Sequence, residues 1–401
     1  MLLLLPSKNI MNNLVSKIKN DKKLHLLIIV LLSALAAVSY VQGIRNAAEF
    51  SQDFQWDAAK VFTMRINPYR ESMNPSGCLD SFGYDEYYLQ MEANQFPSLL
   101  MLLIPYTFLP PLVARYAWIV SNMLFTVGIV FLLRKTFLKS IDRDLFIILS
   151  LLMIAGTPYR NQIGVGQHTL FAFFFFLLAV FLSEKRGLLP EVFTVLSLFV
   201  CYFKYTLTVP LCLYFVYKKK YKEIIISAGI HVALTFVAAW WLNSDFLSMI
   251  IEPLKVSSAL AAEGGLDFGV LLGGSKLSYV LALVVMLILL FIAIKLPPGY
   301  DEAYISVLVL WSLIITYHRT YDFWVIIVVA AFFVAIYRNY LVYFYSVVLM
   351  GVFFVLRVFS ESVPSKLAVG TIYYAFTIVL TAVLVKDMIR TKEEVKEEHT
   401  V

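Results

Sequence analysis

The chain has 401 residues, of which 60% are hydrophobic, 15% aromatic and only 15% charged. Soluble domains have about half apolar and a quarter charged residues, so this composition, with a mean hydropathy of +0.79, excludes a soluble globular protein. The net charge of +6 comes from short basic clusters between apolar segments. This is the positive-inside pattern of a protein in a lipid bilayer and indicates no nucleic-acid partner. Three scattered cysteines provide neither a disulfide framework nor a zinc site.

Apolar segments follow one another from residue 25 to residue 385. Because a membrane helix needs ~20 apolar residues, they predict an all-α polytopic membrane protein with about twelve transmembrane helices. The predicted crossings are residues 25–41, 114–133, 145–156, 170–182, 188–203, 205–217, 224–242, 277–296, 304–317, 323–337, 341–359 and 367–385. Residues 1–24 are expected to be a cytoplasmic segment, residues 25–385 one transmembrane domain, and residues 386–401 a charged cytoplasmic tail.

Two long polar loops interrupt this pattern, over residues 43–113 and 243–276. The first is rich in Asp and Glu, and the segment before it carries several lysines, so we place both loops outside the cytoplasm. Residues 96–111 contain Pro105 and the pair Pro110-Pro111. Since proline interrupts the helical ladder, this stretch is expected to form short interfacial helices.

A second threading of the chain remains open. In it residues 96–111 cross the membrane, and the two short segments that meet at Lys204 form one long helix. That arrangement would leave the basic residues from Arg134 to Arg143 outside, against the charge rule.

Asp53 lies about a dozen residues after the first crossing, where its carboxylate could return to the membrane surface. A carboxylate beside a sugar hydroxyl can act as general base while the hydroxyl attacks an anomeric carbon. The alternative is that Asp53 caps a short helix beginning at Phe54, a common role of Asp. Asp57, one helical turn later, is the second candidate for substrate contact.

The preferred threading brings five polar fragments to the external face: Asp53, residues 160–168, Lys204, the loop near Lys255, and His318-Arg319. Lys204 is the strongest functional candidate among these fragments, because placing an ionisable side chain within an apolar stretch costs free energy and often serves a function. Snorkelling to the interface is its structural alternative. One anion among several cations could hold a lipid phosphate through charge-assisted hydrogen bonds.

The order of several short motifs resembles a known enzyme class. After Asp53 come Asn67-Pro68-Tyr69 and a Phe96-Pro97 that opens a proline-broken apolar run, and later Phe203-Lys204-Tyr205. This order, over residues 25–330, resembles the polyprenol-phosphate-dependent glycosyltransferases of the GT-C fold. Within that fold it is most similar to the polyprenol-phosphomannose-dependent α-mannosyltransferases.

The resemblance implies roles for particular residues. Asp53 occupies the position of the family's catalytic base, and Lys204 that of a lysine ending a short span. Gly166-Gln167-His168 resembles the family's Gly-Gln-Asn, with His168 in place of Asn. The catalytic prediction is Asp53 and His318, and the substrate-binding prediction is Asp57, Arg160, Gln167, His168, Lys204 and Arg319.

These observations predict a membrane glycosyltransferase. It would move one sugar, with mannose favoured, from a polyprenyl-phosphate carrier to a glycolipid or glycan acceptor, with inversion. Its site would face the exterior of the inner (cytoplasmic) membrane. No cofactor or metal is expected, because the chain has no Gly-rich nucleotide loop and no second carboxylate two positions from Asp53. The alternatives are a lipid or polysaccharide transporter or flippase, and an O-antigen-type polymerase or ligase.

Overall fold

The computed structural model describes most of the chain, and the regular secondary structure of the described part is entirely helical. The described residues are 21–49, 51, 53–78, 92–139, 141, 143–261, 266–272, 275–326, 328–329 and 363–398. None of them forms a β-strand, which confirms the all-α prediction.

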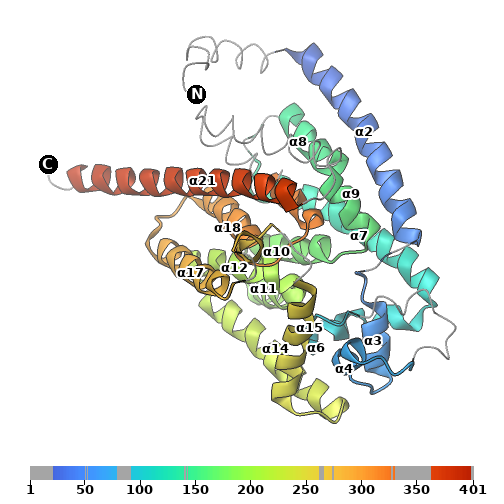
Figure 1. The fold of residues 1–401 in the computed structure, drawn as a ribbon. Helices are drawn as coiled ribbons and strands as arrows, with labels where there is room; N and C mark the ends of the chain where they lie inside the picture. Colours follow the sequence, from blue (N-terminus) through green and yellow to red (C-terminus); the bar gives the residue numbers. More distant parts are fainter. Residues whose placement is uncertain are drawn as a thin grey trace.

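The elements follow the chain as a series of long helices separated by short, broken ones (Figure 1). They are α2 (Lys22–Glu49), α3 (Trp56–Thr63), α4 (Pro68–Met73), α6 (Pro97–Leu100), the 3-10 helix η2 (Met101–Phe108), α7 (Pro111–Thr136), α8 (Arg143–Ala155), α9 (Thr157–Gly164), α10 (Thr169–Ser183), α11 (Leu188–Cys201), η3 (Tyr202–Lys204), α12 (Tyr205–Leu211), α13 (Leu213–Tyr217), α14 (Tyr221–Trp241), α15 (Phe246–Ala261), α16 (Phe268–Leu271), α17 (Leu277–Lys295), α18 (Asp301–Ile315), η4 (Thr320–Phe323) and α21 (Val363–Glu398).

Six helical segments of the described chain are long and apolar enough to cross a membrane, or seven if the bent pair α9–α10 counts as one. The six are Lys22–Glu49, Pro111–Thr136, Leu188–Leu211, Tyr221–Trp241, Leu277–Lys295 and Val369–Thr391. The multi-span prediction is confirmed, but the described residues do not show twelve crossings. Several predicted crossings, such as α8 and α18, are 13 and 15 residues long, short of the ~20 that a span needs. Most of residues 323–337 and all of 341–359 lie outside the described part.

The chain reverses direction at Lys204, although Leu188–Leu211 is long enough to be one span. The Cys212 Sγ lies 3.3 Å from the Tyr202 hydroxyl, a pair that a straight helix would hold about 15 Å apart along its axis. Thr208 Oγ1 also donates to the carbonyl of Cys201 at 2.8 Å. Helix α11 and the α12–α13 segment therefore form a hairpin, as the pair of short predicted segments requires.

Ion pairs and hydrogen bonds show which helix ends share a face. At one end of the bundle His25 on α2 lies 3.8 Å from Asp144 on α8, and Lys218 pairs with Glu184 and Asp301, at 2.9 Å each. We call this the basic face. At the opposite end α3, α4, α6 and α15 pack together (Figure 1).

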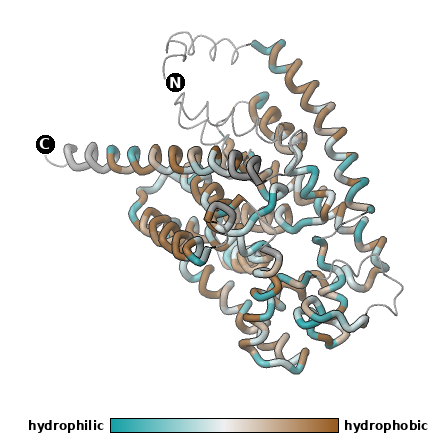
Figure 2. Tube along the Cα trace, in the orientation of Figure 1, coloured by the Kyte–Doolittle hydropathy of each residue, from teal (hydrophilic) through white to brown (hydrophobic). Residues whose placement is uncertain are grey.

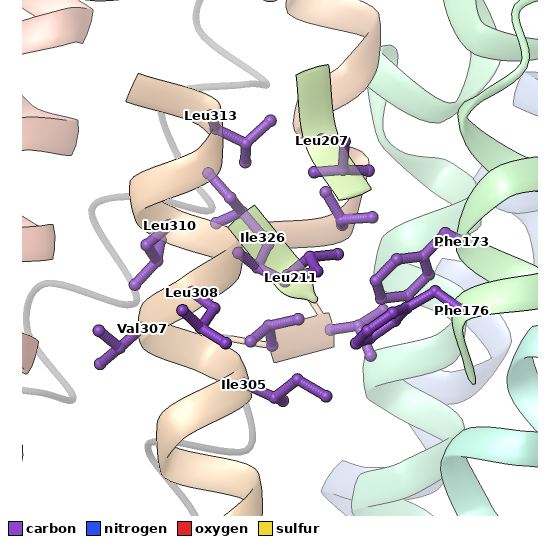
Figure 3. Packing of buried hydrophobic residues seen from close by; sticks show 14 of the residues in the cluster. Phe173, Phe176, Leu207, Leu211, Ile305, Val307, Leu308, Leu310, Leu313 and Ile326 are labelled. Carbon is purple, nitrogen blue, oxygen red and sulfur yellow. The ribbon is translucent and has the colours of Figure 1, made fainter. Parts of the chain in front are cut away.

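Hydrophobic side chains cover the outside of the long helices as well as the core. Figure 2 shows that α2 and α17 consist mostly of hydrophobic residues. Leu26 and Phe291 on these helices are exposed, as expected of surfaces that face lipid. Inside, Leu207 and Leu211 of α12 lie between α18 and the phenylalanines of α10 (Figure 3). Helices α2 and α9 approach so closely at Gly43 that an added Cβ would meet the Arg160 carbonyl at 3.2 Å.

Candidate active site

Asp53 lies in the turn between α2 and α3, and the α9–α10 turn supports it. Its backbone N–H donates to the carbonyl of Val165 at 2.7 Å. The next residue, Phe54, stacks on Trp118 with ring centroids 5.1 Å apart, and Trp118 donates to the carbonyl of Gly166 at 2.8 Å. The α9–α10 turn therefore holds in place the backbone that carries the Asp53 carboxylate.

Asp53 is not a helix cap, so the capping alternative is wrong. Helix α3 begins at Trp56, and its N-cap residue is Gln55, whose side chain makes no capping bond. The Asp53 carboxylate instead accepts a hydrogen bond of 3.2 Å from Gln167 Nε2 and another from the Tyr321 hydroxyl.

The Asp53 carboxylate lines a partly open cavity at the end of the bundle opposite the basic face. It is lined by Asp53, Glu92, Asn94, Gln95, Gln167, Phe203, Lys204, Tyr205, Thr206, Ser257, Tyr317, Arg319 and Tyr321. Burial raises the pKa of the Asp53 carboxyl above its ordinary value, and it outweighs the lowering by Lys204, by the Tyr321 hydrogen bond and by Arg319. The carboxylates of Asp53 and Glu92 thus share one partly enclosed space with the cations of Lys204 and Arg319.

Lys204 reaches the cavity from the tip of the α11–α12 hairpin. Its ammonium lies 3.3 Å from Asp322 Oδ2, and its side chain is only 12% exposed. Asp322 also accepts a hydrogen bond from Thr169 and lies 3.0 Å from His318 Nδ1. Although burial alone would raise the pKa of Asp322, Lys204 and then His318 and Thr169 lower it to about 2, so this carboxylate is charged and balances Lys204.

Arg319 lines the cavity beside Lys204 and is oriented by a neighbouring hydroxyl. Its Nε donates to the Tyr317 hydroxyl at 2.6 Å. His318, by contrast, is fully buried and is absent from the lining. Its Nδ1 is engaged with Asp322, and its Nε2 has no hydrogen-bond partner among the described residues. The structure therefore connects His318 to the cavity through Asp322 and Lys204.

Three other predicted site residues lie away from the cavity lining. His168 is buried, with its Nε2 3.1 Å from the Phe54 carbonyl and its ring 4.3 Å from that of Phe203. Arg160 donates to Gln42 on α2 at 3.2 Å. Asp57 is buried in α3, and burial raises its pKa to about 7 even though Arg115 lowers it.

Sequence reasoning missed part of the lining. The residues that precede α6, namely Glu92, Asn94 and Gln95, and the α15 residue Ser257 all face the cavity, whereas Lys255 does not. The position of these polar residues beside or within apolar helices is a sequence signal that could have identified them as lining residues. Within the described ranges, no group of three His, Cys, Asp or Glu side chains could hold a metal ion.

Comparison with known proteins gives one match. The model of glycosyltransferase family 87 matches residues 97–339, a region that contains Gln167, Lys204 and Arg319 but begins after Asp53. No curated protein is similar enough to match, and no solved structure is either. Because the match covers more than half of the chain, the protein belongs to glycosyltransferase family 87, a family of GT-C mannosyltransferases that depend on polyprenol-phosphate-mannose.

Proposed function

We propose that this membrane glycosyltransferase transfers one mannosyl residue from a polyprenyl-phosphate carrier to a hydroxyl of a glycolipid or glycan acceptor. The observation that carries the proposal is that Asp53 shares its cavity with Lys204 and Arg319. A base for the acceptor hydroxyl and cations for the leaving phosphate are the two things that such a transfer needs.

The chemistry is a single displacement. The acceptor hydroxyl gives its proton to the Asp53 carboxylate while its oxygen attacks the anomeric carbon. The bond from that carbon to the phosphate oxygen breaks, and the electron pair leaves with the lipid phosphate. Lys204 and Arg319 stabilise the charge that builds there. One displacement inverts the anomeric centre. The raised pKa of Asp53 makes it a stronger base than an ordinary aspartate.

We further place the cavity on the external face of the cytoplasmic membrane, with the basic face in the cytoplasm. Lys22, Lys135 and Lys218 belong to helix ends on the basic face, as the charge rule favours for cytoplasmic ends. In this proposal residues 1–24 and 386–401 are cytoplasmic. The short helices α8, α10, α11, α12–α13 and α18 also cross, which with residues 323–359 would give about twelve crossings.

The function is tested with the purified chain in lipid nanodiscs and a radiolabelled donor. We expect label to move from polyprenyl-phosphomannose to octyl α-mannoside or to a membrane lipid extract, and not from a nucleotide-linked mannose. Mannose should be added one residue at a time. Transfer from the nucleotide sugar would contradict the proposal, and so would transfer of preassembled chains, which a polymerase or ligase would catalyse. Movement of intact carrier across a proteoliposome bilayer, without transfer, would indicate a flippase.

A further inference from the structure

The cavity has a second polar group that the proposed chemistry does not use. Asn94 and Gln95 line it just before α6. Their side chains are connected to Gln55, the residue that precedes α3.

The hydrogen bonds fix which way each side-chain amide points. The carbonyl of Glu92 can only accept, so the group that approaches it at 2.7 Å must be the Gln55 Nε2 donor. The same Nε2 donates to Asn94 Oδ1 at 3.1 Å, and Gln95 Nε2 donates to that oxygen at 3.0 Å. Within the described residues this leaves the side-chain oxygens of Gln55 and Gln95 without a partner, and of the two residues only Gln95 lines the cavity.

The Gln95 side-chain oxygen is buried and unpaired. Gln95 is only 6% exposed, and its Oε1 has no hydrogen-bond partner in the described part of the chain. The backbone beneath it is held in place, because the Tyr69 hydroxyl donates to the Gln95 carbonyl at 2.8 Å. Since buried polar atoms are nearly always hydrogen-bonded, a rigidly held acceptor in a cavity wall indicates a ligand that donates.

The donor requirement selects the ligand class. A phosphodiester has only acceptor oxygens and cannot satisfy Gln95. A sugar hydroxyl can donate to Gln95 Oε1 while the sugar ring occupies the cavity that Asp53 lines. We propose that Gln95, held by Asn94 and Gln55, forms a subsite for a hexose hydroxyl. The inference rests on the proposed function, and either the acceptor sugar or the mannose of the donor could supply the hydroxyl.

Binding is measured in nanodiscs with three probes: octyl α-mannoside, polyprenyl-phosphomannose and polyprenyl phosphate. A neutral hydrogen bond contributes enough to change affinity by about 2- to 12-fold. Gln95→Leu should weaken one or both sugar-bearing probes by that factor and leave polyprenyl phosphate unchanged. Loss for the mannoside alone assigns the acceptor sugar, and loss for the phosphomannose alone assigns the donor sugar. Gln42→Leu on α2, outside the cavity lining, is the matched control and should leave all three affinities unchanged.

Equal loss for all three probes, or no loss for any, would overturn the subsite. A second test uses the unaltered protein, so its result does not depend on whether the Gln95→Leu variant folds. Octyl mannoside should bind at least about 2-fold more tightly than its tetra-O-methyl analogue, which keeps the ring but has no hydroxyl donors, and equal binding would also overturn the inference. Because binding is read without turnover, absence of mannosyl transfer would contradict the proposed function and leave this result standing.

Discussion

Lys204 and Asp322 form a buried ion pair at the cavity, and removing the two charges separately and together distinguishes a structural role from a role in donor binding. In Lys204→Met the Asp322 carboxylate, whose side chain is 1% exposed, loses its nearest cation. Breaking a buried pair in this way costs about 3–5 kcal/mol. The single variant should therefore be clearly less stable than the parent protein.

The double variant Lys204→Met/Asp322→Asn removes the uncompensated charge and should recover most of that stability. It should not recover activity. If Lys204 holds the lipid phosphate, the lost charge-assisted hydrogen bond is worth ~1.5–3 kcal/mol, so kcat/KM for the donor should stay ~10- to 150-fold below that of the parent.

The assays are thermal unfolding in detergent and initial transfer rates with the donor varied at fixed acceptor. Lys218→Met is the matched control. Lys218 is likewise an ion-paired lysine, with two carboxylate partners, but it lies at the basic face. This control should lose stability and keep its donor kcat/KM. Recovery of donor kcat/KM in the Lys204/Asp322 double variant would refute the reasoning, because Lys204 would then be only the counterion of Asp322.

Two further predictions concern stability and topology. The pKa of Asp57 is raised from 3.8 to about 7 by burial, so its neutral form stabilises the fold below pH 3.8, and that stability, roughly 4 kcal/mol at ~1.4 kcal/mol per unit, is lost as the pH rises through 7. Asp57→Asn should therefore flatten the fall in melting temperature between pH 5 and pH 8, and an unchanged slope would exclude Asp57 as its cause. In a cysteine-free background, cysteines at Lys204 and Arg319 should be labelled by an impermeant thiol reagent from the side opposite to one that labels Lys139, and labelling of all three from one side would reverse the proposed threading.

The sequence predicted the convergence of Asp53, Gln167, Lys204 and Arg319, for identifiable reasons. Asp53 follows the first apolar helix at a short distance, and Lys204 interrupts an apolar stretch with a charge. Each feature limits where the residue can lie in a membrane protein. The structure brings these residues to one cavity.

The sequence could not show which way each side chain points. His168 and His318 lie next to lining residues, yet both rings turn into the protein and bond to the Phe54 carbonyl and to Asp322. A position in a loop limits a residue to one face, but packing decides its rotamer. Gln95 was missed for the same reason, since the orientation of its unpaired oxygen depends on an amide chain that begins at Gln55.

The number of membrane crossings could also not be predicted by counting apolar segments. Apolar length predicts a span only when the helix is unbroken, and this chain reverses at Lys204 and bends by 107° between α9 and α10. Both breaks bring polar residues to the cavity. The features that mislead a count of spans are therefore the ones that position the site.

The central claim, that Asp53 is the base, is tested most directly by the single-turnover transfer rate of Asp53→Asn over a range of pH. General bases contribute about 10²–10⁴-fold, so the rate should fall by at least ~10²-fold, with thermal stability and polyprenyl-phosphate binding retained. The parent rate should decline as the pH drops through the raised pKa of Asp53, because protonation removes the base, and the Asn variant should lack that decline. Asp57→Asn, the same change outside the cavity lining, should lose less. A rate in Asp53→Asn within about 10-fold of the parent, or the same acid limb in both proteins, would contradict the assignment of Asp53 as the base.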